Sequence, residues 1–535
     1  MGESRLQGGW LVRLSASGWV IALGVFWLCA LRNVELPGLY MDAVNPDYLF
    51  ARWLNPQLHN PVWMIPSGFM PLLGNLYHGM QTLYVGVLTY GLLGTSVVSV
   101  RVTHALYGSV IVLLVWLILR RVSGRPVQAT VLATALATDM AFIGSFRTQA
   151  YIILAGQVWM MLALWLAVRS VHESAPSRWA LALSGMGMGL AVYGYFVFLF
   201  FLPPVAALAI LGSGRHGARQ RAFAWGSGFV VGMLPYVIGY IGLILALGGV
   251  IPFMEWMRHV LGGLAPTVDR ETYWQGLVHV LGFSLWGMAG LGNEHTVIGE
   301  AVSFRLAGWR TGLGVLATVV CMLGAWLEWI KRPRLARVLL AVAVLPFVYI
   351  ALAAFFGSRL GVHHFTVLVA LGYLLLGLSV YWLAVRLQNG AWLTGTAAVL
   401  AVSLFVVNCV QQNWVHARLV ATGGVGMSTD ALPALARMAL SERDLAAWFF
   451  PEWGFFMPFA FLTANQVPYE LELTVTALRR HVASGREMRV AFWKEENHRM
   501  YLEVLEQAGI RNIELRRMYR RDGQVALYVL AGVAP

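Results

Sequence analysis

Long apolar runs alternate with short polar connections over the first three quarters of this chain. A helix needs about 20 predominantly apolar residues to cross the roughly 30 Å hydrocarbon core of a bilayer. Runs of about this length lie at 15–31, 81–98, 105–120, 128–144, 151–169, 180–196, 197–212, 224–247, 307–328, 336–356, 364–386 and 392–410. The pattern predicts a polytopic α-helical membrane protein. The first run follows Arg5 and Arg13 and lacks a small-residue cleavage site, so we expect a retained helix and not a signal peptide.

The pattern changes after residue 411, where the composition becomes that of a water-soluble domain. Alternating apolar residues predict strands, and an amphipathic stretch that ends at Gly509 predicts a helix. The expected strands lie at 487–493, 512–518 and 525–531, with the helix at 496–508 between them. We therefore expect a transmembrane domain over 1–411 and a small C-terminal α/β domain over 412–535. The α/β domain has no glycine-rich phosphate loop, which favours docking over nucleotide chemistry.

Composition supports a membrane protein: 59% of the 535 residues are apolar and only 12% are charged. The net charge of +13 comes from short basic clusters between apolar runs. Such clusters orient a chain in a bilayer, so we expect no nucleic-acid partner. The three cysteines each lie inside an apolar run and show neither metal-ligand spacing nor a disulfide framework.

The basic clusters also constrain the topology, because Lys and Arg concentrate on the cytoplasmic side. Twelve crossings would put the cluster at 120–125 outside. If 81–98 is instead re-entrant or interfacial, eleven spans alternate cleanly and every cluster falls inside. A miscounted break, for example at Pro203-Pro204, stays an alternative and would give 12 or 13 spans. The model with eleven spans predicts a plasma (inner) membrane protein with external loops 34–80 and 249–305 and an extracytoplasmic C-terminal domain.

Two carboxylates, Asp42 and Asp47, follow the first apolar run, and Pro46 between them prevents a continuous helix. A carboxylate at the water boundary lies close to apolar surroundings, which raise its pKa toward the range of a general base. The alternative is that both are ordinary solvated acids beside a helix at 46–54 that Asn45 caps.

Basic residues stand at two turns of the expected outer face, against the positive-inside trend. Arg147 lies between two apolar runs, and Arg359 precedes His363 and His364 at the start of another. Arginine and histidine at a membrane boundary suit a phosphate ligand. Snorkelling is the alternative for Arg147. Zinc is the alternative for the two histidines, although adjacent helical residues point about 100° apart.

The long external loop carries several acids, of which Glu255 stands beside Trp256 just beyond a span. An acid next to an aromatic ring suits sugar binding, although plain solvated surface is the alternative.

Taken together, the order of these features over roughly residues 15–410 resembles the GT-C superfamily of polyprenyl-phosphate-sugar-dependent glycosyltransferases. The branch of protein O-mannosyltransferases and aminoarabinose-lipid A transferases is the most similar. The motifs are the acidic segment 42–48, the Pro/Gly-rich segment 70–79, a span that opens at Arg101, the outer turn at Arg147 and the segment 359–365.

The resemblance implies an inverting glycosyltransferase that moves a sugar from a polyprenyl-phosphate donor to an acceptor hydroxyl of a glycan, lipid or protein on the outer face. It implies Asp42 as the general base with Asp47 in support, and the choice between the two stays open. Phosphate ligands would be Arg147, Arg359, His363 and His364. The side chains expected to contact substrate are Tyr48, Tyr77, His78, Tyr151 and Glu255.

Two departures from the family pattern matter. Ala43 follows Asp42 where many relatives have a second acid, and Gln149 stands where many have an acid beyond the outer-turn arginine. The second departure makes a divalent metal doubtful, and we expect no cofactor besides the donor itself. A transporter or lipid flippase is the main alternative function, and a non-catalytic envelope scaffold is another. A transporter requires ionisable residues within its spans. The spans of this chain are nearly free of charge away from their ends, and the chief exceptions are Asp139 and Glu328.

Overall fold

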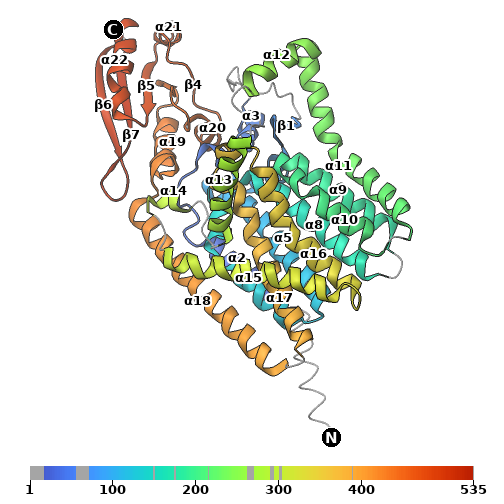
Figure 1. Ribbon diagram of the computed structural model, residues 1–535. Coiled ribbons are helices and arrows are strands. Elements are labelled where there is room, and N and C mark those ends of the chain that lie inside the picture. The colour runs from blue at the N-terminus through green and yellow to red at the C-terminus, as the bar shows by residue number, and fades with distance from the viewer. Residues whose placement is uncertain are drawn as a thin grey trace.

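The computed structural model describes residues 17–55, 71–148, 151–173, 176–214, 216–261, 270–288, 294–300, 304–387 and 390–533. Helices form a bundle, and a small α/β domain is stacked on one end of it (Figure 1). Parts of the two expected external loops, 56–70 and 262–269, lie outside the described residues.

Every expected apolar run forms helix, and seven described helices are long and apolar enough to cross a bilayer. The protein is therefore a multi-pass membrane protein. The helices of the bundle are α2 (Gly18–Leu31), α5 (Val97–Ser123), α6 (Pro126–Ala137), α7 (Met140–Ser145), α8 (Tyr151–His172), α9 (Arg178–Gly194), η2 (Phe196–Phe201), α10 (Leu202–Leu211), α11 (Ala218–Ala246), α15 (Phe304–Glu328), α16 (Pro333–Ala353), η4 (Val362–Thr366), α17 (Val367–Arg386) and α18 (Gly390–Thr422).

Shorter elements connect these helices. They are η1 (Met41–Ala43), α3 (Leu49–Leu54), β1 (Leu73–Asn75), β2 (His78–Gly79), α4 (Gln81–Leu93), α12 (Val250–Leu261), α13 (Arg270–Met288), α14 (Glu294–Ile298) and η3 (Gly357–Arg359). The run at 81–98 does not form one helix: α4 has 13 residues, about 20 Å, and ends before Gly94, and α5 begins at Val97. The segment 249–305, expected as a long loop, instead contains α12, α13 and α14.

The apolar run at 128–144 forms two helices, where one was expected. The break occurs because Asp139 caps α7: its Oδ1 accepts the backbone N–H groups of Ala141 at 2.9 Å and Phe142 at 3.2 Å. A side-chain cap satisfies the unpaired N–H groups of a new helix start, which costs less than leaving them bare inside the bundle.

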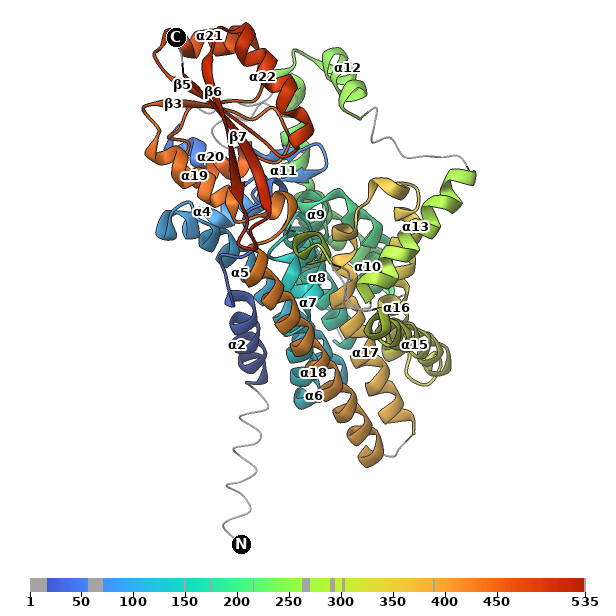
Figure 2. The same cartoon turned by 90° about the vertical axis from the view of Figure 1, so that its left-hand side faces the viewer.

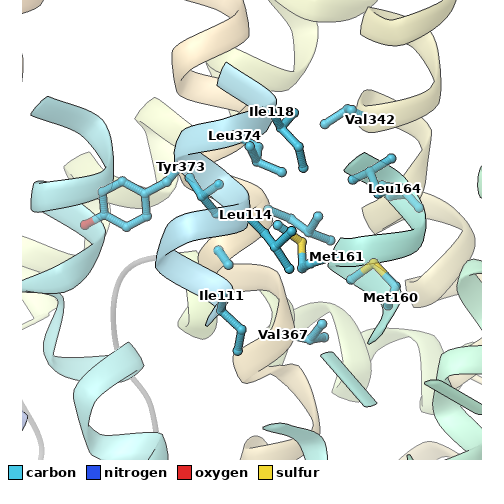
Figure 3. Close-up of a cluster of buried hydrophobic side chains, with 14 of the residues drawn as sticks. Ile111, Leu114, Ile118, Met160, Met161, Leu164, Val342, Val367, Tyr373 and Leu374 are labelled. Carbon is cyan, nitrogen blue, oxygen red and sulfur yellow. The ribbon is translucent and has the colours of Figure 1, made fainter. Parts of the chain in front are cut away.

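Apolar side chains from four helices meet at the centre of the bundle (Figure 3). These side chains are Ile111, Leu114 and Ile118 of α5, Met160, Met161 and Leu164 of α8, Val342 of α16, and Val367, Tyr373 and Leu374 of α17. Tyr373 points its hydroxyl away from this cluster (Figure 3).

That hydroxyl belongs to a polar network inside the bundle. Arg310 of α15 forms a buried ion pair with Asp139 and donates to Gln411 Oε1 of α18 at 3.2 Å. Tyr373 Oη donates to Asp139 Oδ2 at 2.9 Å and accepts from Asn408 Nδ2 at 3.1 Å. The network connects α7, α15, α17 and α18, and each charge in it has a partner.

Basic turns gather at one end of the bundle. Arg337 Nη1 donates to the Gly212 carbonyl at 2.8 Å, and His172 interacts electrostatically with Arg121 and Arg334. These residues come from α5, α8, the α10–α11 turn and the start of α16, so the clusters that the positive-inside rule groups together do lie together. The α/β domain lies at the opposite end (Figure 2).

The C-terminal domain is built on a five-stranded sheet of order β4-β3-β5-β7-β6. β3 is parallel to β4 and β5, and β7 is antiparallel to β5 and β6. Its elements are η5 (Gly426–Ser428), α19 (Ala431–Ser441), β3 (Ala446–Phe449), α20 (Phe456–Leu462), β4 (Tyr469–Glu470), α21 (Val475–Ala483), β5 (Glu487–Phe492), η6 (Glu495–Asn497), α22 (His498–Gln507), β6 (Arg511–Tyr519) and β7 (Val525–Val533). Strands β5, β6 and β7 and helix α22 match the sequence prediction. The domain begins later than predicted, because α18 continues to Thr422.

The two faces of this sheet have different partners. One face packs against α21 and α22. The other shares a hydrophobic core with α19, α20 and the segment that follows α2. Within that core the Tyr48 and Phe456 rings lie 5.8 Å apart and the Tyr90 and Phe461 rings 5.1 Å apart. The soluble domain is thus packed onto the membrane domain through apolar side chains.

Replacing Arg310 by Met leaves the Asp139 carboxylate buried without its cation. We expect a loss of about 3–5 kcal/mol in stability. Arg418→Met is the matched control, because Arg418 and Glu300 form a pair at 2.6 Å in which both side chains are nearly half exposed. That control should cost about 0–1 kcal/mol. Thermal unfolding in detergent measures both, and equal losses would contradict the structural role of the buried pair.

Candidate active site

Arg147 fixes the path of the chain where it leaves α2. Its guanidinium donates to the carbonyls of Asn33 at 3.2 Å, Leu36 at 3.0 Å and Ala30 at 2.8 Å, and also to that of Arg32. The last carbonyls of a helix have no intrahelical partner, so a buried cation here satisfies them and suits the negative end of the helix dipole. The sequence pointed to Arg147 as a phosphate ligand. Its terminal nitrogens are instead engaged with the backbone.

Arg101 of α5 binds the same stretch of backbone, and we call Arg147 and Arg101 together the clamp. Its guanidinium donates to the carbonyls of Phe146 at 3.1 Å, Pro37 at 3.2 Å and Gly38 at 3.4 Å. The two arginines together donate to six of the nine backbone carbonyls from Ala30 to Gly38. Since Asp42 follows four residues later, the clamp determines where this carboxylate lies.

Asp42 stands in η1 with its side chain half-buried. Burial raises its pKa to about 6, and a hydrogen bond with Tyr40 opposes part of that rise. Burial and the nearby Asp42 raise the pKa of Tyr40 to about 12, so Tyr40 keeps its proton and its hydroxyl donates a hydrogen bond to the carboxylate. Asp42 is therefore ionised at neutral pH, and its pKa lies close enough to that pH for the carboxylate to accept a proton from a substrate.

A group of aromatic and histidine side chains lies beside Asp42. We call Tyr77, His78, Tyr195, His363 and His364 the Tyr-His cluster. Tyr77 and Tyr195 both interact electrostatically with Asp42. The Tyr77 and Tyr195 rings lie 5.5 Å apart, and the His78 ring stacks on Tyr195 at 6.3 Å.

The cluster continues from Tyr195 to the two histidines. His364 Nδ1 lies 3.1 Å from the Gly361 carbonyl, which can only accept, so this nitrogen carries the proton of a neutral ring. His364 Nε2 therefore accepts from the Tyr195 hydroxyl at 2.9 Å. The His363 ring lies 4.0 Å from the His364 ring and is partly exposed. Residues from 42, 77, 195 and 363 thus meet at one site.

Asp47 lies in different surroundings from Asp42. Its side chain is completely buried, and His104 Nε2 of α5 lies 3.6 Å from Oδ2. Tyr90 and Tyr107 also interact with it electrostatically. A carboxylate enclosed in this way suits support of the segment more than contact with substrate. The alternative helix at 46–54 capped by Asn45 is wrong: α3 begins at Leu49, its N-cap position is Tyr48, and Asn45 is buried.

The remaining predicted residues fall in varied places. Tyr48 is buried against Phe456 and serves domain docking. Arg359 is exposed in η3, directly before the segment that carries the histidines. Glu255 is exposed on α12, whereas its neighbour Trp256 packs into an apolar cluster. Tyr151 is the first residue of α8, and its side chain lies outside what the structure describes.

Sequence reasoning did not assign Tyr40 or Tyr195 to this site, and it noted Arg101 only as the residue at which a span opens. Tyr195 had a signal, since it lies in the polar-aromatic turn between α9 and η2, flanked by apolar runs. Among the described residues, no group of three or more His, Cys, Asp or Glu side chains is arranged to hold a metal ion.

Comparisons with known proteins agree with this architecture. A family model described as dolichyl-phosphate-mannose-protein mannosyltransferase matches residues 78–249, which include Arg101, Arg147 and Tyr195. No curated protein matches the chain. The crystal structure of ArnT from Cupriavidus metallidurans in the apo state is 14% identical, with a TM-score of 0.59 over 99% of this chain and 99% of that chain. The structure of ArnT from the same organism bound to undecaprenyl phosphate is 15% identical, with a TM-score of 0.58 over 98% of each chain.

The chain has the GT-C fold. The likeness extends over the bundle and the C-terminal domain alike, because the alignments cover nearly the whole length of both chains. The expected resemblance to the GT-C superfamily is confirmed. The family match ends before His363 and begins after Asp42, so the roles of these two residues rest on geometry.

The raised pKa of Asp42 predicts an effect on stability. Its pKa is about 6 in the folded protein and 3.8 as an ordinary carboxyl, so ionisation opposes folding as the pH rises from about 4 to about 6. Asp42→Asn removes this cost. We expect the variant to gain about 2 °C or more in melting temperature over the native protein at pH 7.5, and less at pH 5. Differential scanning fluorimetry in detergent measures this, with the exposed Glu35→Gln as control. A difference that does not change with pH would show that Asp42 is not desolvated.

Proposed function

We propose that this protein is an inverting glycosyltransferase that uses a polyprenyl-phosphate sugar as donor and an acceptor hydroxyl as nucleophile. The observation that carries the proposal is the half-buried Asp42, whose pKa is raised to about 6, beside the Tyr-His cluster at the end of the bundle. A general base works best when its pKa is near the operating pH.

The reaction needs little from the protein beyond orientation and charge. Asp42 accepts the proton of the acceptor hydroxyl while that oxygen attacks the anomeric carbon of the donor. The bond between this carbon and the phosphate oxygen breaks on the opposite face, which inverts the configuration. The leaving polyprenyl phosphate takes the bonding electron pair, and a phosphate is a stable leaving group.

The partly exposed His363 and the exposed Arg359 are the candidates for the phosphate side of the site. They lie just before α17 begins. Tyr195 connects this segment to Asp42, because it donates a hydrogen bond to His364 and interacts electrostatically with Asp42. Their position next to an apolar helix suits a donor whose polyprenyl chain stays in the bilayer. The structure of ArnT bound to undecaprenyl phosphate supports a lipid-phosphate ligand for this fold.

The positive-inside rule supports an external location for the site. The basic turns lie at one end of the bundle and the α/β domain lies at the other (Figure 2). Helix α20 of that domain packs against η1, which carries Asp42. Because Lys and Arg concentrate in the cytoplasmic connections of membrane proteins, the site end faces the periplasm or cell exterior. This orientation fits a location in the plasma (inner) membrane. An already activated lipid donor suits a compartment without nucleotides.

The pairing of the acids inside the bundle disfavours a transporter. Both intramembrane acids noted in the sequence are paired: Asp139 with Arg310, and Glu328 with Arg332 at 3.8 Å and Trp382 at 3.3 Å. Transport sites use intramembrane charges that face a pathway, whereas these connect helices.

Purified protein should release polyprenyl phosphate from at least one sugar in a panel of polyprenyl-phosphate donors when an acceptor glycan, lipid or peptide is present. Asp42→Asn should lower kcat by about 10²-fold or more, because the base is lost. Asp47→Asn should lower turnover less. Product release is measured by thin-layer chromatography of the lipid fraction.

Two controls make this assay decisive. His363→Gln should raise the donor KM if this histidine contacts the phosphate. EDTA should leave turnover unchanged, because the described residues contain no group of three or more His, Cys, Asp or Glu side chains that could hold a metal ion. No turnover of any donor, or full activity of Asp42→Asn, would overturn the proposed function.

Topology has a separate test in a cysteine-free background. Arg125→Cys lies at the basic end, and Arg499→Cys lies on the C-terminal domain, where both native side chains are exposed. An impermeant maleimide added to whole cells should label position 499 and not position 125. The opposite labelling would place the site in the cytoplasm.

A further inference from the structure

The C-terminal domain brings a tryptophan to the Asp42 site. Trp453 lies in the loop between β3 and α20, and its side chain is 48% exposed. It forms a side-chain hydrogen bond with Tyr40, the residue that in turn bonds Asp42. Since an indole N–H only donates, the chain of donors runs from Trp453 to the Tyr40 hydroxyl and from Tyr40 to the Asp42 carboxylate.

The loop that carries Trp453 is held firmly. Glu452 accepts from the Trp493 backbone N–H at 2.6 Å, from Asn497 Nδ2 at 2.5 Å and from Tyr501 Oη at 3.2 Å. The Trp493 indole donates to the Trp453 carbonyl at 2.8 Å. Both carboxylate oxygens of Glu452 are thus occupied, and the backbone at position 453 is fixed from the side of β5 and α22.

The next two residues close the loop against the same partner. Gly454 has φ +108°, and a Cβ there would lie 2.9 Å from Met427 Sδ and 3.2 Å from Trp493 Nε1, so only glycine fits without a shift. Phe455 stacks on Trp493 with ring centroids 4.0 Å apart. The loop therefore holds the half-exposed indole of Trp453 in a defined position next to Tyr40, with apolar ring surface left open to a ligand.

The helix that follows this loop is docked beside Asp42. α20 packs against both η1 and α3. Below it, Asn55 Nδ2 donates to the Asn465 carbonyl at 2.8 Å, and Asn465 Nδ2 donates to the Asn55 carbonyl at 2.7 Å. This reciprocal pair and the shared apolar core fix the distance between Trp453 and η1.

We infer that Trp453 is an acceptor-binding residue, a platform on the soluble domain against which a sugar ring of the acceptor lies while its hydroxyl faces Asp42. The inference rests on the proposed function and adds the acceptor class, a saccharide. An indole face suits the apolar face of a sugar ring, and polar groups beside it suit the hydroxyl rim. The donor side of the site is lined by His363 and Tyr195 from the bundle, so Trp453 flanks the side that water-exposed acceptors reach.

The test measures kinetic constants of the full-length protein with a saccharide acceptor and a donor that it turns over. Trp453→Ala should raise the acceptor KM about tenfold while the donor KM changes less than about twofold. Trp453→Phe keeps an aromatic face and should stay within about threefold of the native acceptor KM. Glu452→Ala loosens the loop and should resemble Trp453→Ala. Trp274→Ala, which removes a 54% exposed tryptophan from α13, is the matched control and should change neither KM.

Each outcome decides one claim. An unchanged acceptor KM in Trp453→Ala, with native turnover intact, overturns this inference and leaves the proposed function standing. A loss in kcat alone that Trp453→Phe shares means that the N–H contact to Tyr40 is what matters, which also overturns the platform. A native protein that turns over only peptide acceptors overturns the saccharide class. A native protein that turns over no donor overturns both the function and the inference.

Discussion

The site depends on the way two buried arginines satisfy the chain as it leaves the first helix. Carbonyl groups at the end of a helix cost free energy unless something donates to them, and water is scarce at the edge of the bundle. Arg147 and Arg101 supply these donors from two separate parts of the chain. The backbone carbonyls in turn accept hydrogen bonds from the guanidinium groups, which are buried and have lost contact with water. Because segment 30–38 is fixed, Asp42 and the core that docks the C-terminal domain fall into defined positions.

The sequence predicts the bundle well because a span is decided by length and hydrophobicity, and both are local. It fails where a local signal is weaker than a distant contact. Asp139 caps α7 inside an apolar run, and Arg310, the cation that pairs with this buried carboxylate, lies 171 residues away in the chain, so the break between α6 and α7 was not predicted. Strand β3 is fully buried and only four residues long, a length at which apolar residues do not distinguish strand from helix. Arg147 was noticed for the right reason, as a cation against the trend, but whether backbone or phosphate neutralises it depends on the fold.

In the candidate site, too, local features were predicted from the sequence and distant contacts were not. Two acids five residues apart cannot be ranked from their spacing, whereas burial separates them at once: Asp47 is enclosed by His104 and Asp42 is left half-open. The segment 359–365 was expected to meet Asp42, and the structure connects them through Tyr195 and His364. Tyr195 supplies this link from more than 100 residues away, and no pattern of spacing predicts such a contact. The sequence therefore pointed to Asp42, His363 and His364, and Tyr195, which connects them, was found only in the fold.

Desolvation of Asp42 is useful and costly for the same reason. An apolar surrounding that brings its pKa to about 6 also penalises the ionised form that a base requires, and the protein needs that form at neutral pH. The Tyr40 hydrogen bond lowers the pKa again and so keeps the carboxylate ionised without exposing it to bulk water. Tyr40 is in turn held by Trp453, and Trp453 by a loop that Glu452 fixes within the C-terminal domain. The protonation state of a group at the membrane boundary is therefore controlled from a domain that begins some 380 residues later in the chain, which gives a reason for the two domains to share one hydrophobic core.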